Sequence, residues 1–196
     1  MGMGPLVLHD TLAAILVWGS YAAWFAIESA LRQRGGGQGR ESRDVTALLV
    51  MLSFPVWMAV GALVADGRPA PIAGAAWWPV ISGLALIWLG IALRVWSILT
   101  LGRFFKLTVV IQEDHRVIDS GPYRLLRHPS YTGALIIAAG FGLAEGDLLS
   151  LAIVLVGVLV PLLIRIRVEE RTLLSELGDA YADYARRTAR LVPGVY

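Results

Sequence analysis

The chain has 196 residues, 57% of them hydrophobic, with a mean hydropathy of +0.66 and a net charge of only +2. This composition excludes an ordinary soluble domain and is typical of an integral membrane protein. The absence of a basic stripe interleaved with aromatic residues argues against a nucleic-acid partner. The chain has no cysteine and its three histidines lack the spacing of zinc ligands, so we expect no disulfide and no metal site.

Five apolar segments are candidates for transmembrane helices, each of which needs roughly 20 residues. The first three run from Pro5 to Leu31, from Val45 to Ala65 and from Ile72 to Leu101. The last two, Tyr131 to Ala144 and Leu148 to Ile164, are separated only by an acidic turn and form a helical hairpin, whose first arm is short for a full span. The sequence thus predicts an all-α polytopic membrane bundle of about five transmembrane helices.

The distribution of arginine predicts the orientation of this bundle. Arginines gather in the loop after the first segment, in the connection from Arg103 to Arg127 and in the C-terminal tail. By the positive-inside rule these regions lie in the cytoplasm and the N-terminus lies outside. We therefore expect one integral membrane domain in the cell inner or plasma membrane, residues 1–196, with three spans in residues 1–101 and both polar clusters on the cytoplasmic face.

The tail from Glu169 onward has a different helical pattern. Leucine, tyrosine and threonine residues recur there at intervals of three and four positions, at Leu173, Leu177, Tyr181, Tyr184 and Thr188. The pattern predicts an amphipathic helix at the membrane surface or over the mouth of the bundle, ended by Pro193-Gly194.

The first polar cluster is the block from Arg127 to Gly133, with the sequence RHPSYTG. His128 precedes Pro129, so its backbone is biased towards extended geometry, and proline is favoured in the first turn of a helix. The block therefore predicts a helix start at the membrane rim, where free backbone N–H groups suit a carboxylate or a phosphate. Its glycine would let another helix or a ligand approach closely. In the alternative interpretation, the arginine only reaches lipid phosphates and the tyrosine belongs to an aromatic belt.

The second polar cluster is the pair Glu169-Glu170, where the last span leaves the membrane. Adjacent helical residues point about 100° apart, so one glutamate can face a pocket while the other pairs with Arg165, Arg167 or Arg171. A carboxylate in the pocket suits an amine or sugar hydroxyls as its ligand. Alternatively, the two acids form a solvated salt-bridge cluster.

Together these residues resemble the isoprenylcysteine carboxyl methyltransferases and the related membrane phospholipid N-methyltransferases. The resemblance covers Gly102 to the C-terminus and rests, in order, on Val109-Val110, Gly121-Pro122-Tyr123, the block from Arg127 to Gly133, Glu169-Glu170, Tyr181-Ala182-Asp183-Tyr184 and Pro193. The combination of the histidine-proline block with paired glutamates is specific, whereas either element alone is weak.

The resemblance implies S-adenosyl-L-methionine as methyl donor, bound by residues 102–196, and a lipophilic or lipidated acceptor that enters from the membrane lipid. Carried over by matching position, the cofactor pocket would be lined by Tyr123, His128, Pro129, Tyr131, Gly133, Glu169 and Glu170, joined by Gln112. Tyr181 and Tyr184 would pack the tail over the cofactor as a lid. Simple docking of an amphipathic helix is the alternative for these two tyrosines.

Two acceptor chemistries follow from the resemblance. An acceptor carboxylate, as in an isoprenylcysteine, is already ionised and needs no general base. Arg127, or else Arg165 or Arg94, would orient it through paired hydrogen bonds. An amine acceptor, as in a phospholipid, would need Glu169 or Glu170 as its base, so the expected catalytic residues are Arg127, Glu169 and Glu170. An NADPH-dependent membrane reductase and a non-enzymatic lipid-binding protein are the alternatives of other classes.

Overall fold

The computed structural model describes the chain except for residues 1–5, 35–44, 68–69, 73–75, 103–116 and 195–196. The described residues form, in order, α1 (Leu6–His9), α2 (Thr11–Arg34), α3 (Val45–Gly67), α4 (Trp78–Leu101), the 3-10 helix η2 (Gly121–Arg124), α5 (Pro129–Ala144), α6 (Leu148–Leu177) and α7 (Asp179–Arg187). The prediction of an all-α bundle is confirmed.

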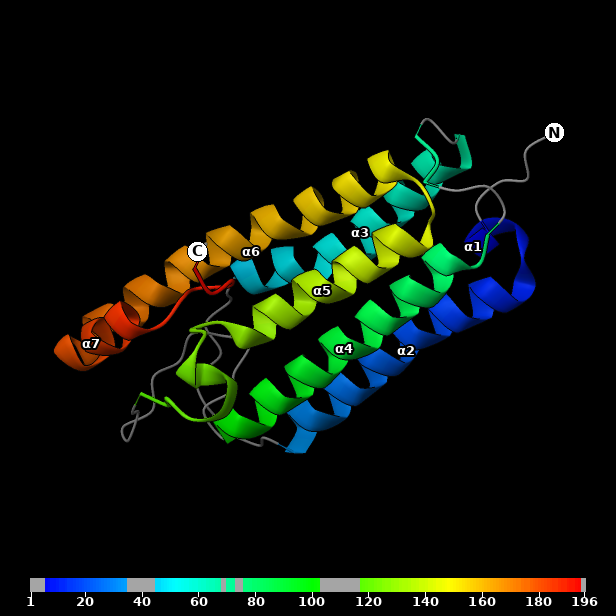
Figure 1. The fold of residues 1–196 in the computed structure, drawn as a ribbon. Helices are drawn as coiled ribbons and strands as arrows, with labels where there is room; N and C mark the ends of the chain where they lie inside the picture. The colour runs from blue at the N-terminus through cyan, green and yellow to red at the C-terminus, as the bar shows by residue number, and fades with distance from the viewer. Residues whose placement is uncertain (1–5, 35–44, 68–69, 73–75, 103–116, 195–196) are drawn as a thin grey trace.

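Four helices, α2, α3, α4 and α6, are long and apolar enough to cross a membrane. The fifth predicted span, α5, is equally apolar but has only 16 residues, and Figure 1 shows it running between α4 and α6 in the middle of the bundle. Large apolar side chains point outward from the long helices, among them Phe25, Leu63, Ile81 and Leu99, each more than 60% exposed. An apolar exterior of this kind belongs to an integral membrane protein.

The contact between α4 and α5 depends on glycine. A Cβ atom added at Gly83 would lie 2.5 Å from the carbonyl oxygen of Gly140, and one added at Gly90 would lie 2.6 Å from that of Gly133. Both distances are far below ordinary contact, so alanine at these positions would force the two helices apart. This close contact fixes the first turn of α5 against α4.

The turn between α5 and α6 is fastened by hydrogen bonds at the end of the bundle opposite to α7 (Figure 1). Asp147 caps α6, because its Oδ1 accepts from the backbone N–H groups of Leu149 and Ser150, both at 3.0 Å. Its Oδ2 accepts from the backbone N–H of Ala70 at 2.8 Å, in the connection between α3 and α4. The acidic turn is therefore tied to a second loop.

The predicted starts of two spans are wrong by several residues. The first apolar segment is divided at Asp10, whose side chain accepts from the N–H of Ala13 at 2.9 Å and so begins α2. The third span begins at Trp78 rather than at Ile72, with Pro79 in its first turn. Proline is favoured at that place because its missing N–H would have no partner there.

The prediction that one amphipathic helix runs from Glu169 through the tail is also wrong. Glu169 lies within α6, which continues for 30 residues to Leu177. The chain then reverses at Gly178, whose φ of +54° lies in the region that favours glycine. The short α7 follows and ends at Arg187, before Pro193-Gly194.

Candidate active site

The histidine-proline block forms the predicted helix start. The 3-10 helix η2 leads into His128, whose φ of −125° and ψ of 56° are neither helical nor the expected extended values, and Pro129 occupies the first turn of α5. Proline fixes its own φ near the helical value and keeps the preceding residue out of the helical region. The result is that His128 lies at the mouth of α5, with its side chain only 4% exposed.

Residues 188–191, which we call the C-terminal strap, pair with this block. The backbone N–H of Arg127 donates to the carbonyl of Ala189 at 2.7 Å, and that of His128 donates to Arg190 at 3.1 Å. In return the N–H of Ala189 donates to the carbonyl of Leu125 at 3.0 Å. The strap thus holds the tail against the entrance of α5 through main-chain hydrogen bonds.

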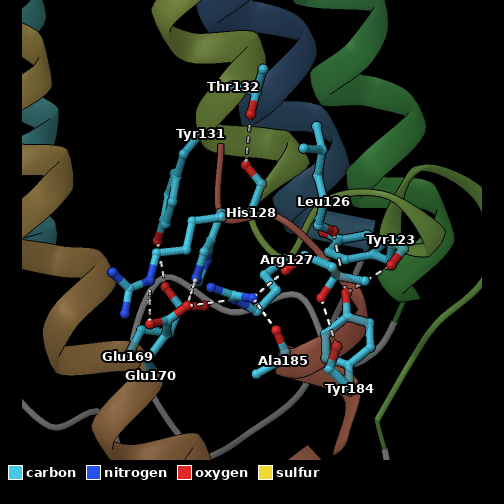
Figure 2. A network of polar contacts seen from close by, with 12 residues as sticks. Tyr123, Leu126, Arg127, His128, Tyr131, Thr132, Glu169, Glu170, Tyr184 and Ala185 are labelled. Atoms are coloured by element: carbon cyan, nitrogen blue, oxygen red, sulfur yellow. Dashed lines mark hydrogen bonds and ion pairs between the residues drawn. The ribbon is translucent and has the colours of Figure 1, made fainter. Parts of the chain in front are cut away.

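Glu170 is the centre of the polar cluster, as Figure 2 shows. Its Oε1 accepts from Arg127 Nε at 2.8 Å and lies 3.2 Å from His128 Nε2. Its Oε2 accepts from Arg190 Nε of the strap at 2.9 Å. The expected partners were arginines on its own helix, but these three partners come from the block before α5 and from the strap. Glu170 therefore ties α6 to both segments.

Glu169 points to a different set of partners, as the angular offset of adjacent helical residues predicts. The hydroxyl of Tyr131 donates to Glu169 Oε2 at 2.7 Å and accepts from Arg165 Nε at 2.8 Å. Arg165 also donates to the hydroxyl of Thr46 on α3, at 2.9 Å. The ring of Tyr131 stacks on that of His128 with centroids 5.5 Å apart, so the two glutamate networks touch through this pair of rings.

Arg127 also fastens α7. Its Nη1 donates to the carbonyl of Ala185 at 2.6 Å and to that of Thr188. The side chain of Arg127 thereby satisfies carbonyl groups at the C-terminal end of α7, where a cation is favoured. Among the described residues Nη2 of Arg127 has no hydrogen-bond partner, so one edge of the guanidinium is available to a ligand.

The two predicted lid tyrosines are both buried in α7 but differ in their contacts. The hydroxyl of Tyr184 is directed at the carbonyls of Tyr123, at 2.8 Å, and of Leu126, at 3.2 Å. Burial raises the pKa of Tyr184 to about 12. The hydroxyl of Tyr181 is buried and, in the described part of the chain, has no hydrogen-bond partner. Burial likewise raises the pKa of Tyr181. Tyr184 thus docks the helix, while Tyr181 offers an unused donor.

The other predicted pocket residues that the structure describes make no hydrogen bond to either glutamate. Pro129 is fully buried at the start of α5, and the side chain of Tyr123 is buried in η2. Gly133 faces α4, since a Cβ there would lie 2.8 Å from the carbonyl of Gly90, so the structure assigns it a helix contact. Gln112 lies outside the described residues. A role in cofactor binding stays a prediction for all four.

A buried ion pair next to the site escaped the sequence reasoning. Arg94 on α4 donates through Nε to Glu28 on α2 at 3.1 Å and through Nη1 to the carbonyl of Ser130 at 3.0 Å. Arg94 and Glu28 are only 8% and 6% exposed. The available signal was an acidic residue inside the first apolar segment, since such a residue must pair. Through Ser130 this pair positions the first turn of α5.

No group of histidine, cysteine, aspartate or glutamate side chains that would hold a metal ion occurs among the described residues. The polar groups of the described site are carboxylates, guanidinium groups, an imidazole and phenols. Such a set can bind a zwitterion, because carboxylates accept from an ammonium group while arginines donate to a carboxylate.

The model of the isoprenylcysteine carboxyl methyltransferase (ICMT) family matches residues 83–175. Protein-S-isoprenylcysteine O-methyltransferase B of Arabidopsis thaliana is 36% identical over 121 residues, and the chain spans 61% of the length of this relative and 61% of its own. A probable protein-S-isoprenylcysteine O-methyltransferase of Oryza sativa subsp. indica is 28% identical over 159 residues, which are 79% of this chain and 83% of that protein.

A solved structure shares the fold. It is the eukaryotic intramembrane Ras methyltransferase ICMT, which matches with a TM-score of 0.65 and 23% identity over 97% of this chain and 71% of that one. This likeness concerns the architecture of the bundle and includes the helices that carry the polar cluster. Residues 83–175 of this chain are thus similar to the isoprenylcysteine carboxyl methyltransferase family, as the motifs predicted.

Proposed function

We propose that this protein is an S-adenosyl-L-methionine-dependent methyltransferase of the membrane, and that it methylates the carboxylate of an isoprenylcysteine-like or other lipophilic acceptor. The observation that carries the proposal is the cluster in which Glu170 joins Arg127, His128 and the strap at the mouth of α5. The relatives named protein-S-isoprenylcysteine O-methyltransferase support the reaction class.

The donor set fits the proposed cofactor. S-adenosyl-L-methionine carries an ammonium group, a carboxylate and ribose hydroxyls, and when bound it would supply an electrophilic methyl group. Glu169 and Glu170 would accept from the ammonium group or the hydroxyls, and His128 and Tyr131 would line the same place. The buried hydroxyl of Tyr181, which has no partner among the described residues, is a donor of the kind that a bound polar ligand satisfies.

A carboxylate acceptor needs no general base from the protein. It is ionised at neutral pH and carries its own nucleophilic lone pair. The residues have to orient it, exclude water and hold its charge, and alignment of this kind can lower a barrier by about 7–11 kcal/mol. Arg127 is the best candidate for orienting it, because its Nη2 is unengaged among the described residues, whereas Arg94 uses Nε, Nη1 and Nη2 on Glu28 and Ser130.

An amine acceptor is the second candidate, and one observation favours it. Glu170 uses both carboxylate oxygens on cations, whereas among the described residues Glu169 accepts only from Tyr131, through Oε2. Glu169 is therefore the carboxylate with an oxygen left to take a proton from an amine. The two acceptor classes thus assign different roles to Glu169: a cofactor ligand for the carboxylate, a general base for the amine.

We further propose that residues 102–196 form the cofactor-binding region and that the cluster faces the cytoplasm. Two observations support this. The cluster is built from η2, the start of α5, the end of α6, α7 and the strap, and the tail that closes it carries several arginines. Labelling of a single cysteine introduced beside Glu176 in sealed cells, with a membrane-impermeant reagent, would test the orientation. The proposed orientation requires protection in intact cells and labelling after permeabilisation.

Calorimetry on the purified protein tests the proposed function directly. We expect S-adenosyl-L-methionine and S-adenosyl-L-homocysteine to bind and NADPH not to bind. Glu170→Gln and His128→Ala should weaken binding at least tenfold with the helical content retained. Glu176→Gln, an exposed glutamate on the same helix, is the matched control and should bind like the wild type. Binding of NADPH alone would instead favour a reductase, and binding of none of the three would favour a lipid-binding protein.

Transfer of a labelled methyl group separates the two acceptors. We expect label in a prenyl-cysteine analogue, as a base-labile ester, and none in the amine headgroups of total membrane lipid. Label in the lipid fraction that survives base, and its loss in Glu169→Gln, would instead establish the amine reaction.

A further inference from the structure

A polar cavity lies beside the cluster, between η2 and the C-terminal end of α7. It has a volume of about 220 Å³ and is lined by Asp119, Arg124, Tyr184, Arg187 and Thr188. None of these residues contacts Glu169 or Glu170 through a side-chain hydrogen bond, so the cavity adjoins the proposed methyltransferase site and shares with it the predicted lid residue Tyr184. Its five lining residues come from two segments that are distant in the sequence.

The cavity has an excess of positive charge. Arg124 makes no hydrogen bond or ion pair within the described part of the chain. Arg187 uses only Nε, which donates to the carbonyl of Asp183 at 3.3 Å, and its two Nη groups are unengaged among those residues. Asp119 offsets one of the two cations, which leaves a net charge of about +1 around the hollow. Two guanidinium groups with free N–H donors around one space are the usual partners of a phosphate.

Exposed apolar side chains are close in the sequence to the residues that line the cavity. Leu125, next to Arg124, is 67% exposed, and Val192, just after the strap, is 45% exposed. The elements next to them, η2 and α7, lie at the same end of the bundle (Figure 1). An exposed apolar side chain beside a basic pocket suits an anionic lipid. The acyl chains of the lipid would remain in the bilayer, and its headgroup would accept hydrogen bonds from the arginines.

We propose that the cavity lined by Arg124, Arg187 and Thr188 binds a phosphate group, and that this binding clamps α7 onto η2. Arg124 belongs to η2, while Arg187 and Thr188 mark the end of α7 and the start of the strap. A phosphate that accepts from both guanidinium groups therefore bridges the same two segments that Tyr184 joins through the carbonyls of Tyr123 and Leu126. The carbonyl of Thr188 also accepts a hydrogen bond from Arg127. A bound phosphate would therefore stabilise the arrangement in which α7 and the strap pack against the neighbouring cluster.

The phosphate could come from an anionic phospholipid or from solution, and the two sources are separated by experiment. The full-length protein is placed in nanodiscs of pure phosphatidylcholine, of phosphatidylcholine with 20 mol% phosphatidic acid, or of pure phosphatidylcholine in buffer with 10 mM inorganic phosphate. Sodium chloride at matched ionic strength controls for screening. The readouts are the unfolding midpoint and the amide hydrogen exchange of residues 179–191. Neither readout depends on methyl transfer, so a failure of the proposed function leaves this test intact.

We expect the arm that supplies the ligand, phosphatidic acid or inorganic phosphate, to raise the midpoint by several degrees and to slow exchange in α7 and the strap at least threefold, since a ligand that binds only the folded form with α7 docked on η2 stabilises that form. A response to phosphatidic acid alone identifies a lipid headgroup, and a response to inorganic phosphate identifies a soluble ligand. The double variant Arg124→Gln/Arg187→Gln should lose the response, and Asp119→Asn should strengthen it.

Arg186→Gln is the matched control. Arg186 is adjacent on α7, has a side chain that is 72% exposed, pairs with Asp183 and does not line the cavity, so its response should equal that of the wild type. The proposal is overturned if the wild type responds to neither phosphate source, or if the double variant and Arg186→Gln respond alike.

Discussion

The two ends of α6 each hold a pair of acidic residues, and the two pairs have opposite environments. At the start of the helix, Asp147 accepts from backbone N–H groups and Glu145 accepts from the hydroxyl of Ser150. Near its other end, Glu169 and Glu170 are reached by arginine, histidine and tyrosine side chains from other segments. The same residue type is therefore held by neutral donors at one end and mainly by ionic ones at the other.

This difference separates a structural role from a binding role. Glu145 is only 3% exposed and burial, with the nearby Asp147, raises its pKa to about 8, although the hydrogen bond from Ser150 opposes this. A neutral carboxyl in a tight turn fastens two helices and has little to offer a charged ligand. Glu170 is a charged carboxylate whose partners can be exchanged for those of a ligand, so its end of α6 is the one suited to chemistry.

The largest loss of stability should come from removing the charge of Arg127, which pairs with Glu170. Arg127→Gln removes a cation from Glu170 and leaves the carbonyls of Ala185 and Thr188 without their donor. Three hydrogen bonds from a charged donor are lost, each worth about 1.5–3 kcal/mol, so we expect a lower unfolding midpoint and faster amide exchange in α7. Arg186→Gln, on the exposed face of α7, is the control. Exchange in α7 equal to that of the wild type would show that Arg127 does not hold the tail.

The protonated Glu145 at the start of α6 should make the stability of the protein depend on pH. The pKa of Glu145 is about 8 in the folded state and near 4.5 otherwise, so the folded state binds more protons between these values. The contribution of Glu145 to stability should therefore be fully present below about pH 4.5 and be lost as pH rises to about 8, by as much as roughly 5 kcal/mol. Thermal unfolding of Glu145→Gln against the wild type, at pH 5 and pH 8, measures this. Equal pH dependence in the two proteins would refute a neutral Glu145.

The smallest loss of stability should come from replacing Asp147, the residue that caps α6. Asp147→Ala removes the acceptor of two N–H groups in α6 and of the N–H of Ala70, which should lower stability by about 1–2 kcal/mol. Asp147→Asn keeps one acceptor oxygen and should lose about half as much. Neither variant should change the affinity for S-adenosyl-L-methionine. A large change in that affinity would mean that the two ends of α6 are coupled.

Much of the fold follows from local rules. The bundle, the hairpin and the start of α5 at Pro129 were predictable, because apolar length and proline geometry depend on short stretches of sequence. The break at Gly178 was not recognised, since the spacing of Leu173, Leu177, Tyr181 and Tyr184 continues across it as if one helix ran through. A glycine followed by aspartate was the available signal, as it favours a reversal and a new helix start.

The site was predictable only in part. His128, Tyr131, Glu169 and Glu170 were expected at one place, and the structure brings them together. Arg190 was not singled out, because the tail has several arginines and the choice among them is made by the strap, whose hydrogen bonds are between main-chain groups. Pairing of that kind has no side-chain signature and arises only from the tertiary fold.

The strap also determines when the site can exist during biosynthesis. Ala189 and Arg190 pair with residues that precede α5, so the polar cluster closes only after both arms of the hairpin have entered the membrane. Because the chain is made from its N-terminus, Arg127 and His128 are synthesised long before Glu170 and the strap reach them. A nascent protein with an incompletely inserted hairpin therefore lacks the assembled cluster, and insertion of the last helix becomes the step that completes it.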